Sequence, residues 1–117
     1  NELAPPNSDG SCYAAAALSV VLDPGVLPEL ARCADSPDAD VRQNLATAYG
    51  RLGGLEQIGT LKTLLCDRVW WVRYRAGHAL LKLKGMDATT LAAVRGSLTD
   101  AYALDMLRHV SAEAALP

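Results

Sequence analysis

The sequence predicts an all-α protein built as an α-solenoid, a stack of antiparallel helical hairpins with about seven helices. Three observations predict this fold. Half of the residues are apolar, Phe is absent, and the apolar residues are mainly Ala and Leu, which lose little side-chain entropy in a helix. The apolar pattern repeats along the chain at a fixed interval, and short polar segments with Gly, Pro or Asp separate the repeats.

The interval of the repeat is 31 residues, and it needs no gap. A shift by this interval places Val41 on Val72, Arg42 on Arg73 and Leu52 on Leu83. A single hairpin cannot bury its apolar face, but stacked hairpins share a continuous core. A compact helical bundle is the alternative fold, although a bundle does not require a fixed period.

The helical pattern divides the repeats into pairs of helices. Asp23 is a candidate N-cap with Pro24 in the first turn, and "GG" after Leu52 is a helix stop. The half-unit "SCYAAAALSVVL" maps backward onto the second helix of a pair. The predicted helices are 11–22, 25–35, 39–52, 56–66, 70–83, 88–98 and 101–115, the last pair in weaker register.

Composition and charge indicate the domain boundaries and the compartment of the protein. Residues 1–10 are expected to be a linker and residues 11–117 one repeat domain. The net charge of −2 gives the whole molecule no attraction to nucleic acid or anionic lipid. No apolar run reaches membrane-span length, and three cysteines without a CxxC pattern indicate buried free thiols. We therefore expect a cytoplasmic domain, and the start without Met raises the expectation of a membrane tether upstream.

Two segments carry a family resemblance. "SPDADVRQNLATAYGRLGG" and "CDRVWWVRYRAGHALLKLKG" resemble short bacterial HEAT-like repeats, which have Asp near the interhelical turn, Val-Arg at the start of the second helix, a small-residue stripe, then Leu and Gly. The resemblance covers residues 25–85 well and extends more loosely to the C-terminus. It implies a HEAT-like, armadillo-like superhelix, similar to the repeats of phycobilin lyases. It also implies structural roles for Arg42 and Arg73, with Asp35, Asp40 or Asp67 as partners.

The second helix of each HEAT-like pair generally lines the concave surface, which points to a candidate binding groove. On the helix 70–83, a line of side chains gathers within about 60° of each other, away from the core stripe. Equivalent positions 31 residues away extend this groove onto the neighbouring helices. The predicted partner-binding residues are Trp71, Arg75, His78, Lys82, Tyr102, Arg51, Asn44 and His109. A purely structural role for both Trp70 and Trp71 remains open.

We expect a non-catalytic scaffold that binds a protein partner in this groove, since aromatic residues and Arg dominate protein interfaces. No cofactor is expected. His78 and His109 fall on adjacent helices, but no further ligand completes a metal site. Catalytic motifs and the His-Glu pairs of HEAT-like deoxyhypusine hydroxylases are absent from the sequence. A phycobilin-lyase-like or other enzyme-accessory role and nucleic-acid binding remain as alternatives.

Overall fold

The computed structural model describes residues 30–115, and all of its elements are helical. In chain order they are the 3₁₀ helix η3 (Ala31–Asp35), α3 (Ala39–Leu52), the 3₁₀ helix η4 (Leu55–Gln57), α4 (Ile58–Leu65), α5 (Trp70–Lys82), α6 (Ala88–Ser97) and α7 (Ala101–Ala115). Among these residues, the one β-bridge pairs Gly54 with Lys84. The described part of the chain is therefore an all-α repeat structure, as the sequence predicts.

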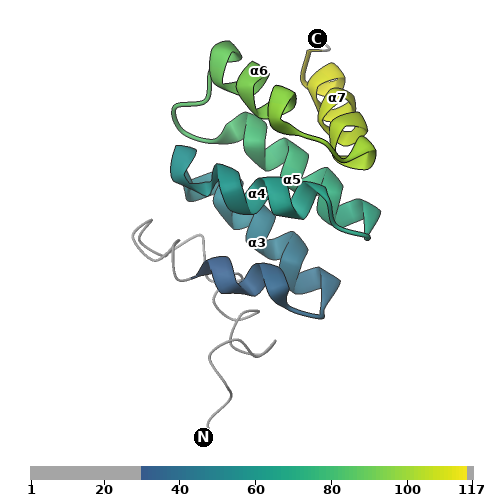
Figure 1. Ribbon diagram of the computed structural model, residues 1–117. Helices are drawn as coiled ribbons and strands as arrows, with labels where there is room; N and C mark the ends of the chain where they lie inside the picture. Colours follow the sequence, from purple (N-terminus) through teal and green to yellow (C-terminus); the bar gives the residue numbers. More distant parts are fainter. Residues whose placement is uncertain (1–29, 116–117) are drawn as a thin grey trace, which may run out of the picture.

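The helices stack in pairs that follow the order of the chain (Figure 1). The first helices of the pairs (η3, α4 and α6) form one layer, and the second helices (α3, α5 and α7) form the other. Helix α5 packs against α3 before it and α7 after it, and also against α4 of its own pair. This arrangement is an α-solenoid in which α5 is the central helix of the second layer.

Short polar side chains set the helix starts. Asp38 precedes α3 and accepts a hydrogen bond from the backbone N–H of Asp40 at 2.9 Å. Asp87 caps α6 through the N–H of Thr90 at 2.7 Å, and Asp100 accepts from the N–H of Ala103 at 2.9 Å. Each carboxylate satisfies a backbone donor that has no partner within its helix.

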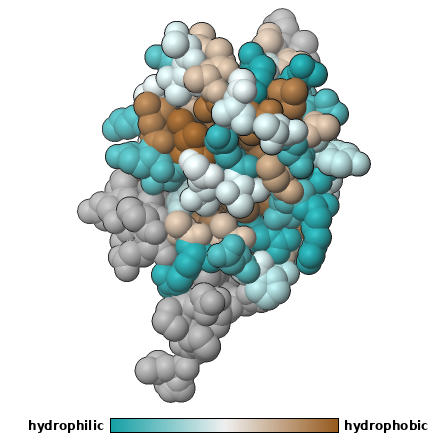
Figure 2. Space-filling model, in the orientation of Figure 1, coloured by the Kyte–Doolittle hydropathy of each residue, from teal (hydrophilic) through white to brown (hydrophobic). Residues whose placement is uncertain are grey.

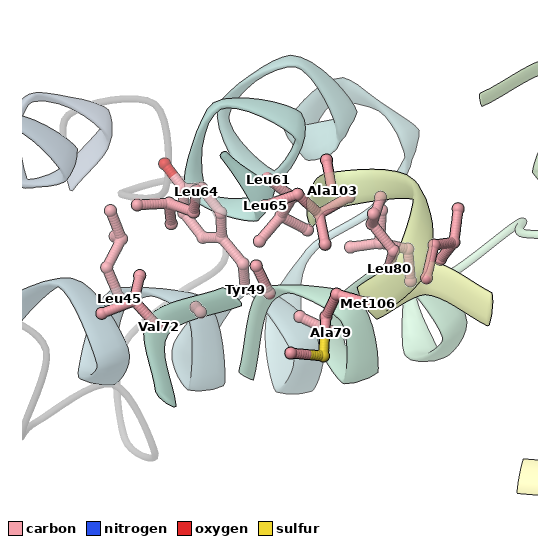
Figure 3. Close-up of a cluster of buried hydrophobic side chains, with 14 of the residues drawn as sticks. Leu45, Tyr49, Leu61, Leu64, Leu65, Val72, Ala79, Leu80, Ala103 and Met106 are labelled. Atoms are coloured by element: carbon pink, nitrogen blue, oxygen red, sulfur yellow. The ribbon is translucent and has the colours of Figure 1, made fainter. Parts of the chain in front are cut away.

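The core lies between the two layers (Figure 3). Leucines of α4 meet side chains from α3, α5 and α7, so the core is continuous across the pairs. Its fully buried large side chains include Leu45, Tyr49, Leu61, Leu64, Leu65, Val72, Leu80, Leu107 and Val110. Burial of each such side chain favours folding by roughly 1.5–3 kcal/mol, which explains why a shared core holds hairpins that would be unstable alone.

Glycine permits close approach of consecutive second helices. A Cβ on Gly50 of α3 would lie 3.1 Å from the Cα of Ala79 in α5. A Cβ on Gly77 of α5 would lie 3.0 Å from Cγ2 of Val110 in α7. These contacts leave little room for side chains, so the spacing of the second layer depends on both glycines.

Hydrophobic surface also remains exposed near α6. Val94 is the buried residue of this helix, and α6 contacts its neighbours less than α4 and α5 do. Figure 2 shows hydrophobic side chains gathered on the upper part of this face, over the region of α4 and α6. The last pair is thus joined to the stack mainly through α7.

The structure confirms the five α-helices predicted after residue 38 and changes one segment before them. The five occupy residues 30–115, near the predicted positions 39–52, 56–66, 70–83, 88–98 and 101–115. The segment predicted to end the helix 25–35 is the 3₁₀ helix η3. Pro37 favours an extended Ser36 (ψ 138°), and the N–H of Ser36 bonds to the carbonyl of Cys33, which tightens the last turn. The predicted helix 11–22, the start of 25–35 and the linker 1–10 lie outside the described residues.

The cysteines also depart from the prediction of buried free thiols. Cys33 is buried in the core and is disulfide-bonded. Cys66 is free, but it is exposed at the end of α4. Cys12 lies outside the described residues. Within residues 30–115, the helices are too short or too polar to cross a membrane.

The close approach at Gly77 predicts a position-specific loss of stability. The variant Gly77→Leu places a side chain against Val110 and should destabilise the protein by about 1–3 kcal/mol. Gly96→Leu is the matched control, because Gly96 of α6 has nothing within 4 Å of its Cβ position. Chemical denaturation followed by circular dichroism measures both. Equal stabilities of the two variants would contradict the close packing of α5 on α7.

Candidate partner-binding face

Arg42 ties one repeat to the next. Its side chain is buried, and it donates from Nε and Nη2 to the two carboxylate oxygens of Asp67, at 2.7 and 3.2 Å. Its Nη1 donates to the backbone carbonyl of Ser36 at 2.6 Å. Asp67 also accepts from the N–H of Val69, which precedes α5. One carboxylate therefore joins an arginine of α3 to the start of α5 in the next pair.

Arg73 occupies the equivalent position one repeat later, and only half of this arrangement recurs. Its Nη1 donates to the carbonyl of Asp67 at 2.8 Å, as Arg42 does to Ser36. The residue 31 positions after Asp67 is Leu98, which has no carboxylate. The Nε of Arg73 is buried without a hydrogen-bond partner. The guanidinium lies instead over the ring of Tyr102, 5.4 Å from its centroid.

Aromatic rings cover the outer face of α5 where it adjoins α7. Trp70 stacks on Tyr74 with centroids 5.0 Å apart, and Trp71 meets Trp70 edge-on at 4.9 Å. Tyr74 also contacts the ring of His78 at 4.6 Å, and His109 of α7 lies 6.1 Å from Tyr74. We call these five residues the aromatic cluster. Each aromatic pair of this kind contributes about 0.5–1.5 kcal/mol to stability in addition to the burial of its surface. The contacts therefore hold the side chains of the cluster in a defined arrangement.

Glu113 of α7 holds the aromatic cluster from the other side. Its Oε1 accepts from the hydroxyl of Tyr74 at 2.9 Å and lies 3.0 Å from Nε2 of His78. Nε2 of His109 is 3.3 Å from its other oxygen. The hydrogen bond from Tyr74, aided by the two histidines, lowers the pKa of Glu113 below its ordinary value. The same bond raises the pKa of Tyr74. The carboxylate thus stays ionised and joins α5 to α7.

A hollow of about 460 Å³ opens between the beginnings of α5 and α7. Its volume is in the range of small-ligand or side-chain sites. Trp70 and Tyr102 are 43% and 69% exposed, which is unusual for large aromatic residues. We call this the α5–α7 hollow; its lining residues are Trp70, Arg73, Tyr102, Asp105, Met106 and His109.

A second, smaller hollow of about 160 Å³ lies between α3 and α5. Three cationic side chains border it: Arg51 from α3, and Arg75 and Lys82 from α5. His78 lies at its rim as well and therefore borders both the hollow and the aromatic cluster. The α3–α5 hollow is therefore a basic region that adjoins the aromatic cluster.

The structure brings most of the predicted partner-binding residues onto this one face. Arg51, Arg75, His78 and Lys82 meet at the α3–α5 hollow, whereas Tyr102 and His109 line the α5–α7 hollow. Trp71, 54% exposed, lines neither hollow and belongs to the aromatic cluster through Trp70 and Tyr74. Asn44 is partly buried on α3 and borders neither hollow. We call the combined surface of α3, α5 and α7 the second-helix face.

Sequence reasoning placed Glu113 on the groove by its position in the repeat, but did not select Tyr74 or Arg73 as parts of this face. Trp70, Tyr74 and His78 are spaced four residues apart, which places them on one side of a helix. That spacing was the available signal for the aromatic cluster. The bond from Tyr74 to Glu113 joins residues 39 positions apart, and no local pattern in the sequence indicates it.

Other candidate chemistry is weak in the described residues. No group of three or more His, Cys, Asp or Glu side chains between residues 30 and 115 has the arrangement of a metal site. Partial burial, with the carboxylate of Asp100, raises the pKa of Cys66, which reduces its thiolate character. The second-helix face is therefore the strongest candidate site.

Comparison with known proteins identifies the family. A family model described as HEAT repeats matches residues 2–80, and again residues 27–115. The chain belongs to the HEAT-repeat family. No curated protein and no solved structure is significantly similar to it. The two overlapping matches are offset by about one repeat, as expected for HEAT repeats that recur along a chain.

Membership of the HEAT-repeat family indicates the general role of such a stack of helices. HEAT repeats generally form scaffolds that mediate protein interactions, and each unit contributes a second helix to a common surface. In this chain the second helices are α3, α5 and α7. The similarity to phycobilin lyases in particular stays a prediction from the sequence.

The contrast between the two arginines predicts different losses of stability. Arg42→Met leaves Asp67 without its buried partner and should destabilise the protein by about 3 kcal/mol. Arg73→Met removes no ion pair within residues 30–115 and should cost about 1 kcal/mol or less. Urea denaturation of the two variants tests this. Equal destabilisation would show that the Arg42–Asp67 pair contributes nothing that Arg73 lacks.

Proposed function

We propose that this HEAT-repeat protein is a non-catalytic scaffold that binds a protein or peptide partner on the second-helix face. The observation that carries the proposal is the exposure of Trp71 and Tyr102, 54% and 69%, beside Trp70 on one continuous face. Large exposed aromatic residues are costly in water and mark interaction sites. Trp, Tyr and Arg are also the residues that contribute most to protein interfaces.

Preorganisation of the face supports the same proposal. Trp71 contacts both Trp70 and Tyr74, and Glu113 fixes Tyr74 and His78 relative to α7. A partner that binds here need not order these side chains, so less conformational entropy is lost on association. The basic rim of the α3–α5 hollow adds a charge that selects partners with acidic groups.

The same features favour a protein partner over nucleic acid. Phosphate recognition along a strand needs an extended basic surface, whereas the basic residues Arg51, Arg75 and Lys82 cluster at one hollow. The net charge of the chain is −2. We therefore propose no nucleic-acid ligand and no cofactor.

The compartment is proposed from the cysteines. The sequence predicted a cytoplasmic domain on the expectation of free thiols. Disulfides persist mainly in oxidising compartments, and Cys33 is disulfide-bonded. An oxidising compartment fits the disulfide at Cys33 better than the cytoplasm does.

Site-specific photo-crosslinking tests the proposed function. A photoreactive phenylalanine analogue is placed at Trp71, and as a matched control at Thr63, an exposed residue of α4 in the other layer. We expect crosslinks to a protein partner in source cells from position 71 and none from position 63. Mass spectrometry identifies the partner.

The variant Trp71→Ala completes this experiment. It should keep the cooperative unfolding of the wild type and lower the affinity for the identified partner by about tenfold or more, as expected for a central aromatic contact. Crosslinks of equal yield from both positions, or an unchanged affinity of Trp71→Ala, would contradict a partner on the second-helix face.

A further inference from the structure

The α5–α7 hollow contains an arginine, Arg73, that has no carboxylate partner among residues 30–115. Arg42 and Arg73 are equivalent by the 31-residue repeat, and the Nη1 of each bonds to an equivalent backbone carbonyl. Asp67 occupies the Nε–Nη2 edge of Arg42. Leu98 stands at the corresponding position for Arg73. Among residues 30–115, no carboxylate lies within ion-pair distance of this second guanidinium.

We propose that the Nε–Nη2 edge of Arg73 binds an Asp or Glu side chain of a partner peptide, which takes the place that Asp67 has beside Arg42. This inference rests on the proposed function and names the chemistry of the partner at one point of the second-helix face. A guanidinium and a carboxylate form two parallel, charge-assisted hydrogen bonds, as Arg42 and Asp67 do here, so the geometry of this edge suits an Asp or Glu side chain.

The surroundings of Arg73 fit such a ligand. Its Nε is a buried donor without an acceptor, and an unsatisfied donor of this kind calls for an explanation. Tyr102, which lies over the guanidinium, is 69% exposed. Because most of this ring is exposed to solvent, its displacement by an approaching carboxylate would break few packing contacts. Trp70 and Met106 line the same hollow and offer apolar surface to the residues that flank the acid.

A negative charge in the α5–α7 hollow allows a second test of the proposal. Asp105 lines the α5–α7 hollow but forms no ion pair with Arg73 in the described structure. Its charge repels an incoming carboxylate through space. The ligand is thus expected to bind against a local repulsion, which removal of the Asp105 charge relieves.

Selection of peptides from a random phage-displayed library on the full chain tests the proposal. We expect the enriched peptides to carry Asp or Glu at one fixed position next to an apolar residue. An enriched sequence is then synthesised twice, with Asp and with Asn at that position. Both peptides are titrated against the protein by the fluorescence of Trp70 and Trp71, the two tryptophans of the chain.

A double-mutant cycle assigns the acid to Arg73. The change from Asp to Asn in the peptide should lower the affinity of the wild type by about tenfold or more and that of Arg73→Met by less than about twofold. Arg68→Met, which removes an exposed arginine that lines neither hollow, is the matched control and should keep the full tenfold difference. Asp105→Asn should tighten binding of the acidic peptide by about threefold.

The outcomes separate this inference from the proposed function. A peptide that binds the face without a fixed acid, or a change from Asp to Asn that costs Arg73→Met as much as the wild type, overturns the role of Arg73 and leaves the scaffold in place. A selection that yields no binding peptide also overturns it. The scaffold itself is then decided by the crosslinks from position 71.

Discussion

Burial of α5 between its neighbours is the constraint on which the rest of the structure depends. Its core stripe packs on α3, α4 and α7, and Val72, Ala76 and Leu80 are fully buried there. The 31-residue repeat places equivalent apolar residues on α3 and α7, so both neighbours offer α5 an apolar stripe, and the contact with α3 is the more extensive. The close approaches at Gly50 and Gly77 then fix the spacing of the second layer.

The candidate site arises where the repeat departs from its own pattern. The Arg42–Asp67 pair connects two units in a buried, satisfied arrangement. One repeat later the carboxylate is replaced by Leu98, and Arg73 turns toward Tyr102 at the surface. Position 70 carries an exposed tryptophan where α3 begins with the smaller Ala39. Regular positions therefore build the scaffold, and irregular ones give the second-helix face its aromatic and charged character.

Much of the fold could be predicted from the sequence, and less of the site. The helices at 39–52 and 70–83 follow from strong periodicity with clear start and stop residues, and the observed α3 and α5 differ from them by one residue at most. The 3₁₀ form of η3 depends on how Pro37 constrains Ser36, which periodicity does not report. The link from Tyr74 to Glu113 depends on the distance between two helices. The loss of the carboxylate partner beside Arg73 could have been predicted from the sequence, because Leu98 stands 31 residues after Asp67.

Native-state hydrogen exchange tests the central role of α5 most directly. Backbone amides in the most stable part of a protein exchange only when the whole domain unfolds. Loosely packed helices open locally at a lower free energy, so their amides exchange faster. We expect the amides around Ala76 and Leu80 of α5 to be the most protected in residues 30–115. Those of α6, where Val94 is the buried residue, should exchange faster by at least about a hundredfold. Protection of α6 equal to or greater than that of α5 would contradict the account.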